Sequence, residues 1–151
     1  MQLFLGKFAR TLDAKNRFSV PASFKAELTG GAYMTQGFDR NVQVLTSGAF
    51  RELYRQASAQ NIADPLARLL LRLFLGSAVE FPNVGATLTM PDSLKEFAGL
   101  QENVLLVGQG DYFEIWSPEA WSEQEDELRN TAANSDRFAG LTLGTRSAHR
   151  Q

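Results

Sequence analysis

Residues 8–24 read Phe-Ala-Arg-Thr-Leu-Asp-Ala-Lys-Asn-Arg-Phe-Ser-Val-Pro-Ala-Ser-Phe, and this stretch decides the fold. Apolar and polar residues alternate on both sides of its centre, Asp13 to Asn16. Alternation over short runs is typical of strands that bury one face, so the stretch predicts two strands joined by a tight four-residue turn. Asp and Asn suit such a turn because their short side chains bond the local backbone, and Asn tolerates a positive φ.

The residue types on which most enzymes rely are scarce. The chain has no cysteine, which excludes disulfides, thiolate metal sites and cysteine nucleophiles, and its only histidine is His149. Asp92 and Glu96 are ordinary acids at a helix start. We therefore expect no enzyme, no metal, no cofactor and no small-molecule substrate. No apolar run of about 18 residues and no signal-peptide pattern occurs, so we expect a cytoplasmic protein without membrane contact.

Charge is divided unevenly along the chain, although the formal net charge is only −2. The first 60 residues carry eight cations and four anions, whereas the remainder carries seven cations and thirteen anions. A positive N-terminal part favours contact with a polyanion such as nucleic acid.

The sequence contains an internal repeat. Residues 18–25 align with residues 88–95, and residues 37–45 align with residues 108–116 after one insertion. Each copy predicts a strand, a turn, a strand, a short helix begun by proline, two further strands and an amphipathic helix. Ser47 is the predicted cap of the amphipathic helix in the first copy. The expected fold class is α+β, mainly β. A copy of about 45 residues is too small to hold a core without a metal or a disulfide, so the repeats must share a core, either within the chain or by exchanging strands with another copy of the chain.

A leucine-rich helix is predicted between the copies. Asp64 suits its cap, Pro65 its first turn and Gly76 its end. Leucines cover most of its circumference and leave only a narrow polar stripe of Arg68 and Arg72. Such a helix is either buried between the repeats or used as a subunit contact, and burial is the preferred interpretation.

Three motifs resemble the MraZ family: Asp13-Ala-Lys-Asn-Arg17-Phe-Ser-Val-Pro21, Phe74-Leu-Gly-Ser-Ala-Val-Glu80 and Leu105-Leu-Val-Gly-Gln-Gly-Asp-Tyr-Phe-Glu-Ile-Trp116. The resemblance implies two tandem SpoVT/AbrB-type swapped-hairpin repeats, β-barrel-like, that interlock as a pseudo-dimer within one chain, with flanking helices. The boundaries that follow are repeat 1 at 5–50, a helical connector at 51–76, a degenerate repeat 2 at 77–120, and a C-terminal helix with a mobile tail at 121–151.

The same resemblance implies a function. Proteins of this kind form ring-shaped homo-oligomers and repress the bacterial division and cell-wall gene cluster, including their own gene. They bind G-rich direct repeats in promoter DNA, which implies a nucleoid-associated protein in the cytoplasm. This chain departs from the family at the turn glycine, which is Asn16, and in repeat 2, where Asn83 and Thr87 replace the expected Asp and Arg. Repeat 2 is therefore expected to be chiefly structural.

The first-repeat hairpin is the predicted DNA-binding site. A two-stranded ribbon fits the major groove, where Arg17 can donate from its planar fork to O6 and N7 of guanine. Asp13 is assigned an orienting role, because a carboxylate that pointed at DNA would repel phosphate. The remaining predicted DNA-binding residues are the phosphate anchors Lys15, Lys7 and Arg10, together with Asn16.

Alternatives remain open at this level. From the residues alone, a surface ion pair between Arg17 and Asp13 that holds a hairpin is the preferred interpretation, and the family resemblance shifts the preference to DNA reading. Arg10 fits a phosphate contact and a solvated strand face equally well. For the whole chain, the alternative function is an oligomeric protein-interaction or assembly module that has lost specific DNA binding, which the acidic pI and the degenerate repeat 2 favour.

Overall fold

The computed structural model describes residues 3–141. Within these residues the chain forms eight strands and six helices that separate into two units, residues up to 118 and residues from 119 onward. In chain order the elements are β1 (Lys7–Thr11), β2 (Arg17–Ser19), α1 (Ala22–Glu27), β3 (Ala32–Gln36), β4 (Val42–Thr46), α2 (Ser47–Ser58), α3 (Pro65–Gly76), β5 (Val79–Phe81), β6 (Thr87–Thr89), α4 (Asp92–Phe97), β7 (Asn103–Gly108), β8 (Tyr112–Trp116), α5 (Pro118–Arg129) and α6 (Thr131–Phe138).

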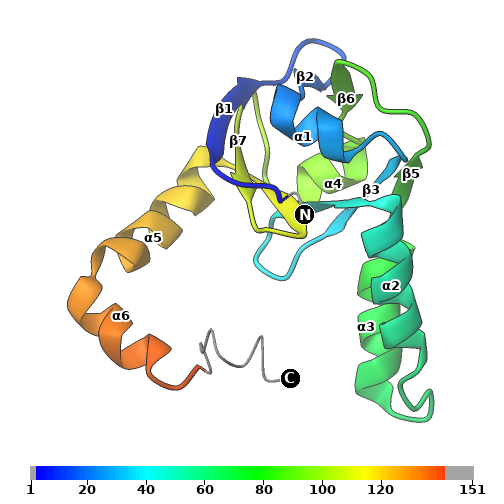
Figure 1. Ribbon diagram of the computed structural model, residues 1–151, viewed down its shortest axis with the longest axis vertical. Coiled ribbons are helices and arrows are strands. Elements are labelled where there is room, and N and C mark those ends of the chain that lie inside the picture. The colour runs from blue at the N-terminus through cyan, green and yellow to red at the C-terminus, as the bar shows by residue number, and fades with distance from the viewer. Residues whose placement is uncertain (1–2, 142–151) are drawn as a thin grey trace. The chain divides into compact units, whose positions relative to one another are not determined.

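The two repeats interlock strand by strand. The main sheet has the order β1-β7-β8-β4-β3-β5, and a second sheet consists of β2 and β6 alone (Figure 1). Thus β1 of the first repeat pairs with β7 of the second, and β5 of the second pairs with β3 of the first, while β4 and β8 meet at the centre. Every pairing is antiparallel. This exchange is the swapped-hairpin pseudo-dimer that the family resemblance implies, and the α+β class is confirmed.

Residues 8–24 do contain two strands and a turn, but the two strands do not form a hairpin ladder. Phe8 of β1 lies opposite Leu106 of β7, and Phe18 of β2 lies opposite Leu88 of β6. A local alternation pattern fixes which face of a strand is buried, not which strand lies beside it. The six-stranded sheet is open and does not close into a barrel.

The shared core is built from both repeats. Phe24 of α1 is 1% exposed, and its ring centre lies 4.6 Å from that of Phe113 in β8 and 5.2 Å from that of Phe4. Met34 and Leu94 are fully buried in the same cluster. Because neither repeat could enclose these side chains alone, their burial stabilises the interlocked arrangement rather than either half.

The helices α2 and α3 lie side by side and extend away from the sheet (Figure 1). The cap of α2 is Thr46, whose side chain accepts from Ala49 N–H, and not Ser47 as predicted. The predicted cap of α3 is present, since the Asp64 carboxylate accepts from Leu66 N–H. None of the helices within residues 3–141 has the length and apolar composition that a membrane crossing requires.

The interpretation of α3 as a helix buried between the repeats is wrong. Only Ala67 and Phe74 of this helix are buried, whereas Leu66 is 72% and Leu69 59% exposed. Phe74 stacks on Phe50 of α2, so α3 packs along one face, while Leu66, Leu69 and Leu75 are exposed on the surface.

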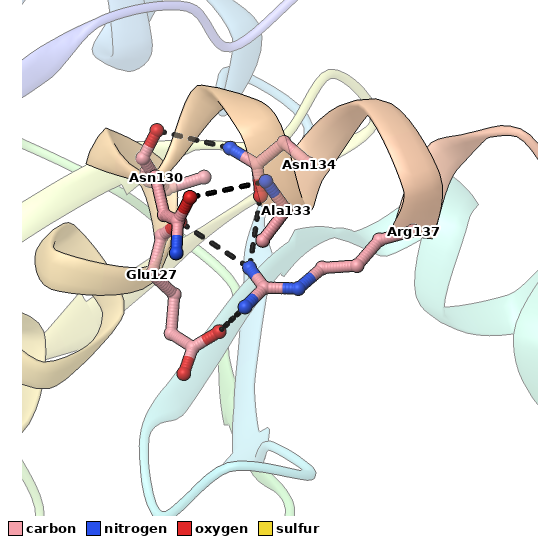
Figure 2. A network of polar contacts seen from close by, with 6 residues as sticks. Glu127, Asn130, Ala133, Asn134 and Arg137 are labelled. Carbon is pink, nitrogen blue, oxygen red and sulfur yellow. Dashed lines mark hydrogen bonds and ion pairs between the residues drawn. The ribbon is translucent and has the colours of Figure 1, made fainter.

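The second unit, from residue 119 onward, contains most of α5 and all of α6. Asn130 separates α5 from α6 and caps α6, because its side-chain oxygen accepts from Ala133 N–H (Figure 2). Arg137 of α6 forms an ion pair with Glu127 of α5 at 2.8 Å and donates to Asn134 (Figure 2). A C-terminal helix with a mobile tail was predicted at 121–151, and residues 131–138 of this stretch form the helix α6. The rest of that prediction, residues 142–151, lies outside the described part of the chain.

Candidate nucleic-acid interface

The turn between β1 and β2 is closed by its backbone. Asp13 N–H donates to Arg17 O at 2.9 Å, and Asn16 N–H donates to Asp13 O at 2.9 Å. Asn16 has a φ of +62°, a left-handed conformation that Asn adopts more readily than most residues with a side chain. This explains how the chain forms the turn without the glycine that the family resemblance leads one to expect.

The Asp13 carboxylate lies at the centre of the turn. Its Oδ1 accepts from the backbone N–H groups of Lys15 at 2.8 Å and Arg17 at 2.9 Å. Its Oδ2 forms an ion pair with Arg17 Nε, also at 2.9 Å. The hydrogen bond from the Arg17 backbone is the main reason why the pKa of Asp13 lies below its ordinary value, and the Arg17 side chain and the Lys15 backbone lower it further. Asp13 therefore stays ionised near neutral pH.

Arg17 stands at the surface of the turn. Its side chain is 48% exposed, and only its Nε is engaged, with Asp13. Within residues 3–141 its two terminal amino groups make no hydrogen bond, so both remain able to donate to an external acceptor. The ion pair with Asp13 limits the rotamers from which they do so.

The other predicted cations differ in their surroundings. Lys15 is exposed on the turn, and Lys7 is exposed at the start of β1. Arg10 is half-buried: its Nε donates to Ser19 O at 3.1 Å, and its guanidinium lies 5.6 Å from the centre of the Phe8 ring. Arg10 therefore joins β1 to β2 at the edge of the turn, whatever else it binds.

Among the predicted DNA-binding residues, Asn16 makes contacts that the sequence did not predict. Its Nδ2 donates to Asp92 Oδ1 at 3.0 Å, and its Oδ1 accepts from Lys95 Nζ at 2.9 Å. Both partners lie on α4 of the second repeat. Sequence reasoning missed them and took Asp92 for an ordinary helix-start acid. The only available signal was the alignment of residues 88–95 with residues 18–25, which does not reveal that β6 lies beside β2.

The corresponding turn of repeat 2 lacks this chemistry. Asn83 and Thr87 are exposed there and provide neither a carboxylate nor a guanidinium. In the two-stranded sheet Arg17 lies opposite Thr89, and Ser19 lies opposite Thr87. The cationic turn of this ribbon is therefore contributed by repeat 1.

These features define a class of protein: two swapped-hairpin repeats interlocked in one chain, with an exposed Asp–Arg turn on a two-stranded ribbon. Residues 3–73 and 88–141 match the model of the MraZ protein family. The chain belongs to the MraZ family, which consists of transcriptional regulators and not of enzymes. The resemblance inferred from the sequence is thus confirmed.

Several relatives that carry the name transcriptional regulator MraZ are similar over most of their length. The protein of Thermomicrobium roseum is 36% identical over 128 residues, which cover 83% of this chain and 89% of the relative. That of Clavibacter michiganensis is 38% identical over 122 residues, 80% of this chain and 85% of the relative. That of Roseiflexus castenholzii is 36% identical over 138 residues, 91% of this chain and 94% of the relative.

Proposed function

We propose that this protein is a sequence-specific DNA-binding transcriptional repressor that reads promoter DNA through the turn between β1 and β2. The observation that carries the proposal is the hydrogen bonding of the Arg17 guanidinium. Its Nε is fixed by an ionised Asp13, while both terminal amino groups are available at the surface. A guanidinium held in this way is suited to a directed, two-point contact rather than to a diffuse attraction.

The chemistry of such a contact is specific for guanine. In the major groove guanine presents O6 and N7 as neighbouring acceptors, and the guanidinium fork of Arg17 matches them. One contact of this kind contributes about 1–3 kcal/mol of discrimination against other bases. Lys15 and Lys7 would then meet phosphates, and Arg10 would do so where its contact with Ser19 allows. Asp13 would orient Arg17 without touching DNA.

A single turn is a small binding element, so we expect several to act together. The exposed leucines of α3, with Leu66 and Leu69 foremost, favour self-association through this helix. Head-to-tail contacts that close into a ring would place successive turns along direct repeats, and the linked turns would bind more tightly than one alone. G-rich direct repeats are the operator that this arrangement fits.

The regulated genes are inferred from family membership rather than from geometry. We propose that the operator lies upstream of the division and cell-wall gene cluster, and that repression includes the gene of this protein itself. The protein would then act in the cytoplasm in association with the nucleoid. The repeat boundaries stated above belong to the same proposal.

The test is binding of the full chain to a duplex from its own upstream region and to a random duplex of equal length. Arg17→Ala should abolish the preference for upstream DNA and leave the oligomer mass by light scattering unchanged. Arg129→Ala removes an equal charge from an exposed site on α5 and should bind as the wild type does.

Two results would contradict the proposal. If Arg17→Ala retains the wild-type preference, the turn is not the reading element. If the wild type shows no preference and its affinity does not fall as salt rises, the alternative of an assembly module that has lost DNA binding is favoured, and the exposed face of α3 would be its working surface.

A further inference from the structure

We propose that Asn16, Asp92 and Lys95 form a clamp by which the second repeat positions the DNA-reading turn of the first. The inference rests on the proposed function, because it assigns to Asn16 the part of a positioning residue for Arg17. It gives repeat 2, whose own turn has lost the Asp and the Arg, a definite share in DNA recognition.

The clamp has a fixed polarity. Asn16 Nδ2 donates to the Asp92 carboxylate, and Asn16 Oδ1 accepts from the Lys95 ammonium. A carboxylate can only accept and an ammonium can only donate, so a flipped amide would lose both bonds. A backbone bond from Met90 N–H to Asn16 O at 2.8 Å adds a third tie at the same residue. Asn16 is thus held on three sides by the chain segment that includes β6 and α4.

The position of the clamp connects it to Arg17. Asn16 directly precedes Arg17. Two backbone hydrogen bonds close the turn, from Asn16 N–H to Asp13 O and from Asp13 N–H to Arg17 O. At a φ of +62° a glycine would be the less strained choice. What the asparagine adds is its amide, which is bonded to α4 at both its nitrogen and its oxygen. Without it, the turn is free to pivot about its backbone ties and to carry the guanidinium with it.

The internal repeat offers a comparison within the chain. In the alignment of residues 18–25 with 88–95, the counterpart of Asn16 is Ala86 and the counterpart of Asp92 is Ala22. Neither alanine can make the corresponding side-chain bond, so the degenerate turn of repeat 2 has no equivalent side-chain clamp and keeps only the backbone bond from Val20 N–H to Ala86 O. Within residues 3–141 the clamp is therefore present only at the turn that retains the Asp–Arg pair. A link that served only to hold two similar repeats together would not need to occur at that turn alone.

The clamp should matter for specificity more than for stability. Its three side chains are exposed or half-buried, so they contribute little to unfolding free energy. A turn that must be ordered on binding, however, loses affinity relative to one that is already in position. We expect about a tenfold loss of preference for upstream DNA when the clamp is removed, which corresponds to about 1.4 kcal/mol.

The first variant is Asn16→Gly, which removes the amide, keeps the net charge and tolerates the positive φ. The matched control is Asn83→Gly, the same exchange at an exposed site of the second-repeat turn. The measured quantity is the ratio of Kd for random duplex to Kd for upstream duplex, with the melting temperature alongside. Asn16→Gly should lower this ratio about tenfold at a nearly unchanged melting temperature, and Asn83→Gly should leave it unchanged.

The second experiment is a double-mutant cycle that stays decisive even if Asn16→Gly folds poorly. Asn16→Asp places a carboxylate against Asp92 and should reduce the ratio. Asp92→Asn alone keeps an acceptor for the Asn16 amide and should bind nearly as the wild type does. In the double variant Asn16→Asp/Asp92→Asn the new amide can donate to the new carboxylate, so specificity should recover. Strictly additive effects would mean that the two side chains act independently, and the clamp would be overturned.

Arg17→Ala, measured in parallel, separates this inference from the proposed function. If Arg17→Ala abolishes the preference while Asn16→Gly and Asn16→Asp bind as the wild type does, the clamp is refuted and DNA reading by Arg17 stands. If Arg17→Ala itself keeps the preference, the proposed function and the clamp fall together.

Discussion

Arg17→Lys is the most informative single exchange, because it separates charge from geometry at the proposed contact. In the structure Arg17 commits Nε to Asp13 and keeps two terminal amino groups, enough for one bidentate contact with guanine. Lysine retains the positive charge but offers a single ammonium that cannot reproduce a planar fork.

The magnitude follows from this difference. Loss of one bidentate contact removes about 1–3 kcal/mol of discrimination, which reduces the preference for upstream over random duplex roughly 5- to 150-fold for one turn. The slope of log affinity against log salt should stay the same, since the number of phosphate charges neutralised does not change. Arg17→Ala, by contrast, should reduce the steepness of that slope if the guanidinium also contributes charge near the backbone.

The assay is fluorescence anisotropy with both duplexes at several salt concentrations, with Arg129→Lys on α5 as the matched control. The expected outcome is a lower preference at an unchanged salt slope for Arg17→Lys and no change for the control. The reasoning is refuted if Arg17→Lys keeps the full preference. It is refuted equally if affinity for both duplexes falls by the same factor, since Arg17 would then act as a charge without reading bases.

Further predictions concern the turn, α3 and the core. The Asp13 carboxyl should titrate by NMR below its ordinary pKa of 3.8. Any stability that this carboxylate contributes is complete above the pKa of the unfolded chain and is lost as the pH falls through the lower pKa of the folded chain. Arg17→Ala should raise the pKa of Asp13 only part of the way to its ordinary value, because the hydrogen bond from the backbone of residue 17 remains. Leu66→Gln combined with Leu69→Gln should lower the oligomer mass by light scattering without lowering the melting temperature of the subunit; an unchanged mass would exclude α3 from the contact. Phe24→Ala should destabilise the fold by about 3–5 kcal/mol in urea unfolding, and a loss under 1 kcal/mol would contradict the shared core.

The parts of the fold that the sequence predicts are those that depend on local patterns. The exposed Arg17 and Ser19 flank the buried Phe18, as the alternation indicates, and Pro91 begins the short helix of repeat 2 as expected. A shared core followed from a physical argument about size, because neither repeat could bury a core alone. Which strand would lie beside which came from the family resemblance and not from the pattern.

The predictions of packing that were wrong, a ladder between β1 and β2 and burial of α3 between the repeats, concern neighbours that are distant in the chain. The leucines around α3 suggested burial, yet within residues 3–141 only Ala67 and Phe74 of this helix are buried. Thr35 Oγ1 donates to Phe74 O at 2.7 Å and ties the end of this helix to β3, which no local pattern in either segment indicates. The contacts of Asn16 likewise join residues 76 and 79 positions apart.

The asymmetry between the two repeats has a physical explanation in their covalent linkage. In a dimer of identical single repeats, every copy would carry the same turn and the same supporting helix, so reading and support could not be assigned to different copies. In one chain they can. Repeat 1 keeps Asp13 and Arg17, while the position of Arg17 in repeat 2 is Thr87 and the position of Asp92 in repeat 1 is Ala22. On the proposed function, the change at Thr87 is tolerated because repeat 2 no longer has to read bases, and its helix remains useful because it holds the turn that does.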